Sequence, residues 1–409
     1  MKILKASWVI SCDGDNTIIK DGAVVFDKKI IAVGTSDYIK TKYPNQKIED
    51  LGKNTVLMPG LINSHIHLEF SSNSTTLKYG NFISWLNSVI KSREKLVNSA
   101  TKELINKKLE FIKKTGTTTI GAISSYSYDL EPCAKSDLNV VYFTEVIGSK
   151  PDMIDTLFND FKARLNSAKL EKREGFYPSI EIHSPYSVHP FLVRETLKIA
   201  KKEKLAVSAH FLESPEEYDW LHKDEGGFVD FFKNFLGQKK AVTKPMEFLN
   251  QFENINPLSF THCVEASEDD LKKIKSLGAI INHCPTSNRI LNNSKLNIQN
   301  LIDLDIPFSI GTDGLSSNNS LSMFDELRNA LMIHTQQNIV SFANLLINGA
   351  TRNGAKALGL NKGSLQKDKD ADLIVLTLPD EVENKEDLPL NVILHTKEVD
   401  KTIIGGSYV

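Results

Sequence analysis

Hydrophobic and polar positions divide the chain into three zones. Residues 1–56 alternate apolar and polar positions with a period of two, as in "AVVFDKKIIAVG", which is typical of short antiparallel strands. From 57 to 361, apolar runs such as "VVYFTEVIG" and "AVSAHFLES" alternate with charged stretches whose apolar residues recur every three or four positions, as in amphipathic helices. Residues 362–409 return to short strands.

This order of elements predicts the fold class. Repeated strand-then-helix units indicate a parallel sheet, and eight candidate strands between residues 57 and 361 favour a closed (β/α)₈ barrel over an open sheet. Because both ends of the chain have strand character, we expect residues 1–56 and 362–409 to pair into one small β-sandwich. The expected architecture is therefore an α/β barrel (57–361) beside a composite sandwich built from both termini.

Composition and charge narrow the function classes. Lys plus Arg (49) nearly balance Asp plus Glu (51), and no basic cluster is interleaved with aromatic residues, which argues against a nucleic-acid partner. The first residues lack the apolar core of a signal peptide, and no apolar run approaches the length of a membrane span. The four cysteines contain no C-x-x-C pair. We expect a cytoplasmic protein without membrane contact that acts on a small molecule.

Polar residues close most of the apolar runs of the middle zone. In a barrel the carboxyl ends of the strands and the loops after them form the active site. The second run ends only in Ser124 and Ser125, whereas the other seven runs end in histidines or acids. These are His65, His67, Glu145, His183, His210, His262, His283 and Asp313. We expect these side chains to gather at one mouth of the barrel.

The first of these strand ends indicates a metal site. In "GLINSHIHLEF", His65 and His67 point to the same face, because residues i and i+2 of a strand do so. Two imidazoles directed at the same position are best explained by a divalent cation that both of them bind. With His210 and Asp313 at later strand ends, three neutral imidazoles and a carboxylate suit Zn²⁺ or Fe²⁺, with a position left for water.

Several motifs occur in one order along the chain: "MPGLINSHIH", "HFLES", "FTHCV", "NHCPTSNR", "IGTDGLSSNNSLSMFDELR" and "KDADLIVL". On these motifs the chain resembles the amidohydrolase superfamily, in the branch of mononuclear nucleoside and aromatic deaminases. The resemblance implies the same barrel and composite sandwich. Binuclear relatives usually need a bridging lysine, or another bridging acid or cysteine; the fourth strand, "SIEIHSPYS", has His183 and no lysine, so we expect one metal ion. His283 is not assigned to it, because the ligand set is complete.

The resemblance also implies catalytic roles. Asp313 would bind the metal and accept the proton of the attacking water. Glu213 in "HFLES" would act as the proton shuttle, protonating a ring nitrogen and then helping to deliver a proton to the departing amine. His262 would hold the hydroxide in line and stabilise the tetrahedral intermediate. The nearby Glu216 and Glu217 are expected to be ordinary solvated charges.

Residues that contact the substrate are implied in the same way. His183 in "HSPYS" would contact the sugar or the base of a purine nucleoside. In "FISWLNSVIKSRE", Trp85 would form an aromatic wall, or else pack in the core, and Glu94 would hold the ribose hydroxyls. Glu145 would have a similar polar role. Arg289 stands where relatives commonly have leucine, and its guanidinium would bind a substrate carboxylate or pair with an acid of the protein.

Arg289 and the long eighth-strand motif make the chain most similar to the aminodeoxyfutalosine deaminases of menaquinone biosynthesis. Their substrate joins a 6-aminopurine nucleoside to a carboxyphenyl ketone, and its deamination gives futalosine and ammonia. Deamination of adenosine, methylthioadenosine, S-adenosylhomocysteine or guanine stays open, as do an aromatic chlorohydrolase and a non-catalytic barrel. Barrels of this type often form homodimers. The segment "DEGGFVDFFKNFLGQ" is a candidate for closing over the substrate, or a plain helix start.

Overall fold

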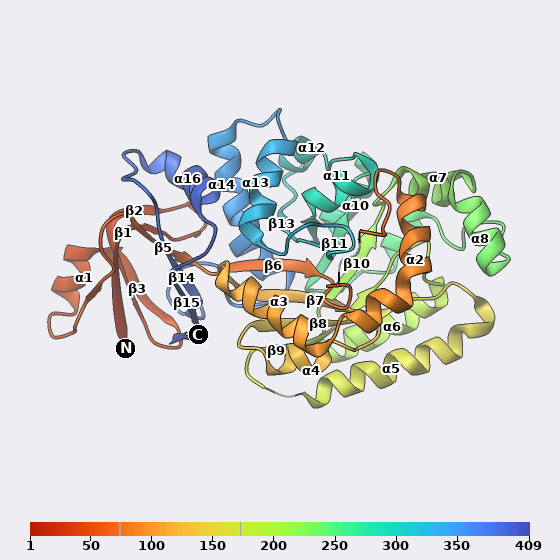
Figure 1. Cartoon of the computed structure of the whole chain (residues 1–409), viewed down its shortest axis with the longest axis horizontal. Coiled ribbons are helices and arrows are strands. Elements are labelled where there is room, and N and C mark those ends of the chain that lie inside the picture. Colours follow the sequence, from red (N-terminus) through yellow and green to blue (C-terminus); the bar gives the residue numbers. More distant parts are fainter. Residues whose placement is uncertain (73–74, 172) are drawn as a thin grey trace.

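The middle of the chain forms a closed parallel barrel (Figure 1). The computed structural model describes residues 1–72, 75–171 and 173–409. Eight strands pair in sequence order, and every pair is parallel. They are β6 (Leu61–Ile66), β7 (Thr117–Ser124), β8 (Asn139–Val146), β9 (Phe176–Ile182), β10 (Val207–Phe211), β11 (Leu258–His262), β12 (Ile280–His283) and β13 (Phe308–Ile310).

The first and last strands of the barrel meet. The Asp313 amide donates to the His65 carbonyl oxygen at 3.0 Å, and Ser64 Oγ donates to the Ile310 carbonyl oxygen at 2.9 Å. All eight residues of β8, "NVVYFTEV", are buried, because a barrel strand is covered by the interior on one face and by helices on the other. The predicted (β/α)₈ fold is confirmed.

Helices surround the barrel (Figure 1). Their formation follows from local sequence; in α3, for example, the Thr101 side chain caps the Leu104 amide, and Ile105, Leu109 and Ile112 are buried along one face. The helices are α2 (Phe82–Ser99), α3 (Lys102–Lys114), α4 (Leu130–Lys135), α5 (Ile154–Leu170), α6 (Pro190–Glu203), α7 (Pro215–Lys223), α8 (Phe228–Leu236), α9 (Pro245–Asn250), α10 (Glu268–Ser276), α11 (Pro285–Asn292), α12 (Ile298–Asp303), α13 (Met323–Ile333), α14 (Ile339–Asn348) and α15 (Gly354–Ala357), with the short turns η1 (Pro151–Met153) and η2 (Gly349–Asn353).

Both ends of the chain join a second sheet, which lies beside the barrel (Figure 1). β14 pairs antiparallel with β5 and thereby connects the two terminal segments. The sheet contains β1 (Lys2–Ile10), β2 (Ile18–Phe26), β3 (Ile30–Thr35), β4 (Glu49–Asp50), β5 (Thr55–Pro59), β14 (Leu373–Thr377), β15 (Lys401–Ile404) and β16 (Ser407–Tyr408), and the same segments carry α1 (Ser36–Lys42), η3 (Lys385–Asp387) and α16 (Leu388–His395). Because β5 runs to Pro59, the strand continues past residue 56, and the domain limits given above stay a prediction.

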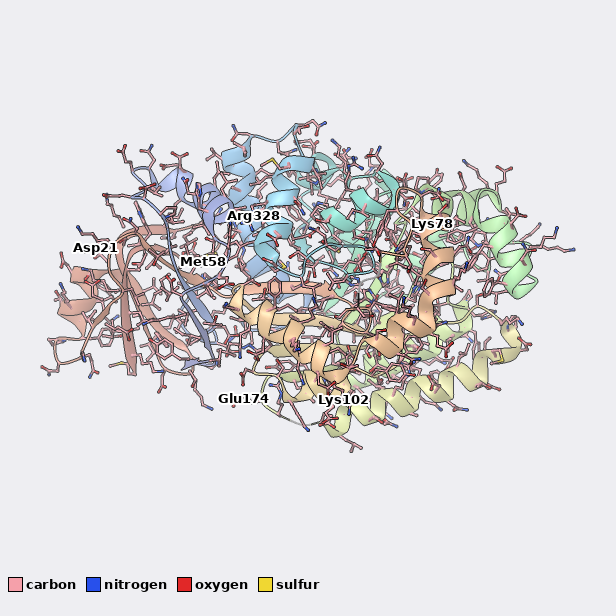
Figure 2. All side chains as sticks on the ribbon, viewed as in Figure 1. Asp21, Met58, Lys78, Lys102, Glu174 and Arg328 are labelled. Atoms are coloured by element: carbon pink, nitrogen blue, oxygen red, sulfur yellow. The ribbon has the colours of Figure 1, made fainter. Side chains whose placement is uncertain are left out.

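The terminal sheet has a hydrophobic cluster of its own and also shares one with the barrel. Leu57, Leu373 and Val375 pack with their neighbours inside the sheet. Met58, labelled at the junction in Figure 2, is fully buried, and it belongs to the same cluster as Leu346 of the barrel helices. Within the described ranges, no helix combines the length and the apolar character that spanning a bilayer requires.

Candidate active site at the carboxyl end of the barrel

The four predicted metal ligands meet at one end of the barrel. His65 lies near the end of β6, His67 follows that strand, His210 lies on β10, and Asp313 comes three residues after β13. His65 Nε2 is 3.2 Å from His67 Nε2 and 3.8 Å from Asp313 Oδ1, and His67 Nε2 is 3.4 Å from the same oxygen. The ring centroids of His65 and His210 are 4.8 Å apart. The structure therefore brings these four residues together around one point.

These separations fit a divalent cation. Ligand atoms placed tetrahedrally about 2.0–2.2 Å from Zn²⁺ lie about 3.3–3.6 Å from one another, close to the separations observed here. His210 Nδ1 donates to the His183 carbonyl oxygen at 2.8 Å, which leaves Nε2 of the ring for the site. Although burial disfavours the charged ring, Glu181 at 3.2 Å raises the pKa of His210 to about 10, so this position favours positive charge, either a proton or a metal ion.

Asp313 is oriented by two hydroxyl groups. Ser287 Oγ and Ser317 Oγ donate to Asp313 Oδ2 at 2.7 and 2.8 Å, so Oδ1 is the oxygen that faces the histidines. Burial alone would favour the neutral carboxyl, but His67 and the other site histidines lower the pKa of Asp313 below its usual value. Gly311 permits this approach, because an added Cβ would lie 2.8 Å from His65 Cβ. Asp313 therefore presents one ionised oxygen to the metal position.

Glu213 and His262 lie beside the four predicted metal ligands, and we call these six residues together the floor of the site. Glu213 Oε1 lies 3.5 Å from His262 Nε2. Burial, followed by the charge of Asp313, raises the pKa of Glu213 well above its ordinary value, which favours the protonated carboxyl. Burial lowers the pKa of His262 to about 4, so its ring is neutral. His262 Nδ1 donates to Asn288 Oδ1 at 2.8 Å, and Nε2 has no hydrogen-bond partner among the described residues.

The backbone is strained around this floor. Leu212, His262 and Asp313 have φ values of 47°, 71° and 57°, in the left-handed region that residues other than glycine seldom adopt. Each of them is at a strand end or in the loop that follows a strand. Strain of this kind clusters at functional sites, where the surrounding structure holds it in place.

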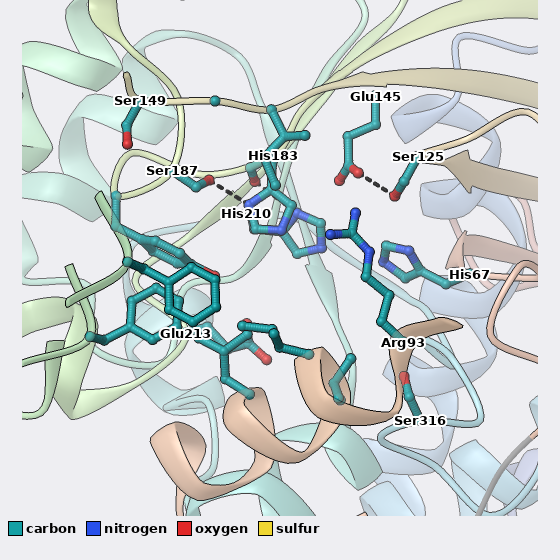
Figure 3. Close-up of a pocket in the computed structure, with 18 of the residues that line it drawn as sticks. His67, Arg93, Ser125, Glu145, Ser149, His183, Ser187, His210, Glu213 and Ser316 are labelled. Atoms are coloured by element: carbon teal, nitrogen blue, oxygen red, sulfur yellow. Dashed lines mark hydrogen bonds between the residues drawn. The ribbon is translucent and has the colours of Figure 1, made fainter. Parts of the chain in front are cut away.

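A cavity of about 480 Å³ opens above the floor (Figure 3). Its wall includes three of the predicted substrate residues. The His183 imidazole is hydrogen bonded through Nδ1 to Ser187 Oγ at 2.6 Å. Trp85 is half-buried, and its Nε1 donates to the Ser316 carbonyl oxygen at 2.8 Å. Glu145 is buried; Ser125 donates to its Oε2, and its Oε1 has no partner within the described ranges.

The two other predicted substrate residues lie elsewhere. Glu94 and Arg289 are both exposed, and neither lines the cavity. Residues nine apart on a helix point in opposite directions, so Glu94 on α2 faces away from Trp85. Val89 and Arg93, four and eight residues after Trp85, share its face and do line the cavity. The helical spacing of "WLNSVIKSRE" was therefore a usable signal for Arg93.

Glu217, expected to be a solvated charge, is buried, so that prediction is wrong. It lies in the first turn of α7, and its Oε2 accepts the Glu213 amide at 2.8 Å, which ties the helix back to the strand end. Glu216 beside it is half-buried and accepts a hydrogen bond from Asn81 Nδ2 at 2.7 Å. Ser287 and Asn288, which orient Asp313 and His262, were also missed, although both lie in "NHCPTSNR".

His283 lies outside the metal position. Its neighbour Asn282 points into the barrel, where its Nδ2 donates to Thr261 Oγ1 at 3.0 Å. Because side chains alternate along a strand, His283 points outward, and its Nε2 is 2.9 Å from Nε2 of the buried His334.

Comparisons with known proteins agree with this geometry. Residues 56–409 match the amidohydrolase family. The chain is 45% identical over 406 residues to an aminodeoxyfutalosine deaminase of a Nitratiruptor species, covering 99% of this chain and 98% of the relative. It is 34% identical over 413 residues to an adenosine deaminase of Helicobacter pylori, covering 100% and 99%.

A solved structure has the same fold over its whole length. The crystal structure of Helicobacter pylori aminofutalosine deaminase in complex with methylthio-coformycin superposes with a TM-score of 0.94 at 34% identity, covering 100% of both chains. On the family match, the full-length relatives and the His and Asp cluster at the barrel mouth, the chain belongs to the amidohydrolase family.

Proposed function

We propose that this protein is a metal-dependent hydrolytic deaminase of a 6-aminopurine nucleoside. Its substrate would be 6-amino-6-deoxyfutalosine, and its products futalosine and ammonia. The observation that carries the proposal is the floor of the cavity, where Glu213, whose pKa is raised by burial, lies beside a neutral His262 and next to the His and Asp cluster. The relatives described above support the choice of substrate. Association into a homodimer stays a prediction.

The metal would be one Zn²⁺ or Fe²⁺ ion. His65, His67, His210 and Asp313 would hold it, because these side chains converge and the outer atoms of His210 and Asp313 are already hydrogen bonded. When bound, the ion supplies Lewis-acid activation of a water molecule.

Proton transfer would be carried out by three side chains. Asp313 accepts a proton from the attacking water, since its Oδ1 is ionised and faces the site. His262, with its Nδ1 hydrogen committed to Asn288, accepts a hydrogen bond at Nε2 and orients the water. Glu213 donates its proton to the purine ring nitrogen while the water oxygen adds to the adjacent carbon. The bond between the carbon and the amino nitrogen then breaks, the amino group takes up the proton that Asp313 accepted and leaves as ammonia, and the proton of the added hydroxyl group returns to Glu213.

The nucleoside would lie between the wall residues described above. His183 and Glu145 offer polar atoms toward the cavity, and Trp85 offers an aromatic surface. Glu94 and Arg289 have no such position and receive no substrate contact in this proposal. Beyond the floor, α8 contributes Phe231 and other apolar side chains, which suit the carboxyphenyl ketone part of the substrate.

The test is ammonia release from metal-loaded protein. We expect kcat/KM for aminodeoxyfutalosine to exceed the values for adenosine, methylthioadenosine, S-adenosylhomocysteine and guanine at equal concentration. A preference for another aminopurine would retain the deaminase chemistry and refute the proposed substrate. No ammonia from any of these compounds would refute the deaminase proposal and direct assays to halogenated aromatic rings.

A further inference from the structure

Two cationic side chains besides the histidines line the cavity, and neither has been given a role. Arg93 comes from α2 and Lys150 from the loop after β8. Among the described residues, neither side chain forms an ion pair with a carboxylate. Arg93 is exposed and Lys150 is half-buried, so both cations contact solvent while they line the cavity, where a ligand of opposite charge can reach them.

Arg93 is held in a defined position. Its guanidinium lies over the Tyr126 ring, 4.8 Å from the ring centroid. The Arg93 side chain points into the cavity (Figure 3). A guanidinium that packs on an aromatic face keeps its N–H groups directed outward in its own plane, where a carboxylate can accept two hydrogen bonds.

Tyr126 is in turn fixed by a buried acid. The Glu69 carboxylate accepts the amides of Ser125 at 2.7 Å, Tyr126 at 3.0 Å and Tyr128 at 2.8 Å. Glu69 is 1% exposed. These three hydrogen bonds to one carboxylate hold the loop in place, and with it the Tyr126 ring over which Arg93 lies.

No acid among the described residues supplies a counter-ion for Arg93. Glu145, the nearby acid of the wall, is hydrogen bonded to Ser125 and forms no ion pair with Arg93. Arg289, which we expected to bind the substrate carboxylate, does not line the cavity. The charge of Arg93 therefore remains available for a ligand that carries an acid.

We propose that Arg93, supported by Tyr126, binds the carboxylate of the substrate and selects acidic 6-aminopurine nucleosides over neutral ones. The inference rests on the proposed function and assigns one residue to its specificity.

The experiment compares one acidic and one neutral substrate. In Arg93→Met, kcat/KM for aminodeoxyfutalosine is expected to fall roughly 10- to 100-fold, mainly through KM, as for loss of hydrogen bonds to a charged group. For methylthioadenosine, which has no carboxylate, the change should stay below about 3-fold, and this activity also reports that the variant is folded. Arg289→Met is the matched control, and we expect it to change neither substrate.

Two outcomes would overturn the assignment. Equal losses for both substrates would mean that Arg93 acts on the nucleoside or on the fold. A fall in kcat/KM for aminodeoxyfutalosine alone in Lys150→Met, with none in Arg93→Met, would mean that Lys150 binds the carboxylate.

Failure of the proposed function can be told apart from failure of this inference. A wild-type protein that deaminates methylthioadenosine but not aminodeoxyfutalosine would refute the proposed substrate. Arg93 is then tested with benzoate as an inhibitor of methylthioadenosine deamination. Weaker inhibition of Arg93→Met than of wild type would still support carboxylate binding, and equal inhibition would overturn it.

Discussion

The floor and the wall of the cavity are built in different ways. On the floor, residues such as His210 and Asp313 lie at strand ends or in the loops just after them, and each has a hydrogen-bonded partner that fixes one side of its polar group. The wall combines strand-end residues such as Glu145 with side chains from α2, from α8 and from the loop after β8, among them Trp85 and Phe235. Barrel geometry therefore constrains the floor, whereas the rotation of α2 and α8 decides which of their residues join the wall.

This difference predicts that changes on the floor affect turnover most. Glu213→Gln replaces the carboxyl group, whose pKa burial raises, by an amide of the same size that cannot transfer a proton. We expect kcat to fall by about 10²- to 10⁴-fold, as for loss of a general acid. The bound metal, measured by elemental analysis, should be retained, because Glu213 is not one of the proposed ligands.

A neighbouring glutamate provides the control. Glu216→Gln keeps the oxygen that accepts from Asn81, and Glu216 does not line the cavity. Its kcat should equal that of wild type. Near-normal turnover in Glu213→Gln would remove Glu213 from the mechanism.

An intermediate effect is expected for the partners of floor residues. Asn288→Leu removes the oxygen to which His262 Nδ1 donates and allows the imidazole to rotate or change tautomer. Loss of such a positioning partner typically costs about 10- to 100-fold in activity. Asn288→Asp keeps an acceptor at the same place and should lose much less. Equal losses, or an unchanged pH profile of kcat/KM in Asn288→Leu, would show that Asn288 does not orient His262.

The same contrast explains what the sequence could predict. The barrel and its polar strand ends followed from the apolar runs that alternate with helix-patterned stretches, because a barrel places the carboxyl ends of all its strands at one mouth. The roles of Ser287 and Glu217 were not predicted from the sequence, because they depend on which loop folds back onto which strand end. Glu94 was chosen instead of Arg93 although the rotation of about 100° per helical residue favours Arg93. Arg289 lies next to the buried Asn288 but on the outer side of α11.

The smallest effect is expected at the outer edge of the wall. Phe235 on α8 lines the cavity but is 58% exposed, and its ring stacks on Phe231 with centroids 5.3 Å apart. In Phe235→Ala, KM for aminodeoxyfutalosine should rise roughly 3- to 10-fold, since covering roughly 40 Å² of apolar surface contributes about 1 kcal/mol. The shorter methylthioadenosine should be unaffected, and kcat should not change for either substrate.

The control for Phe235 is another exposed phenylalanine. Phe191 on α6 is 43% exposed and does not line the cavity, so Phe191→Ala should leave both KM values unchanged. A rise in KM for both substrates in Phe235→Ala would mean that α8 holds the nucleoside rather than its extension. A fall in kcat would mean that the wall also positions the floor residues. The two parts of the cavity would then not have the separate roles proposed here.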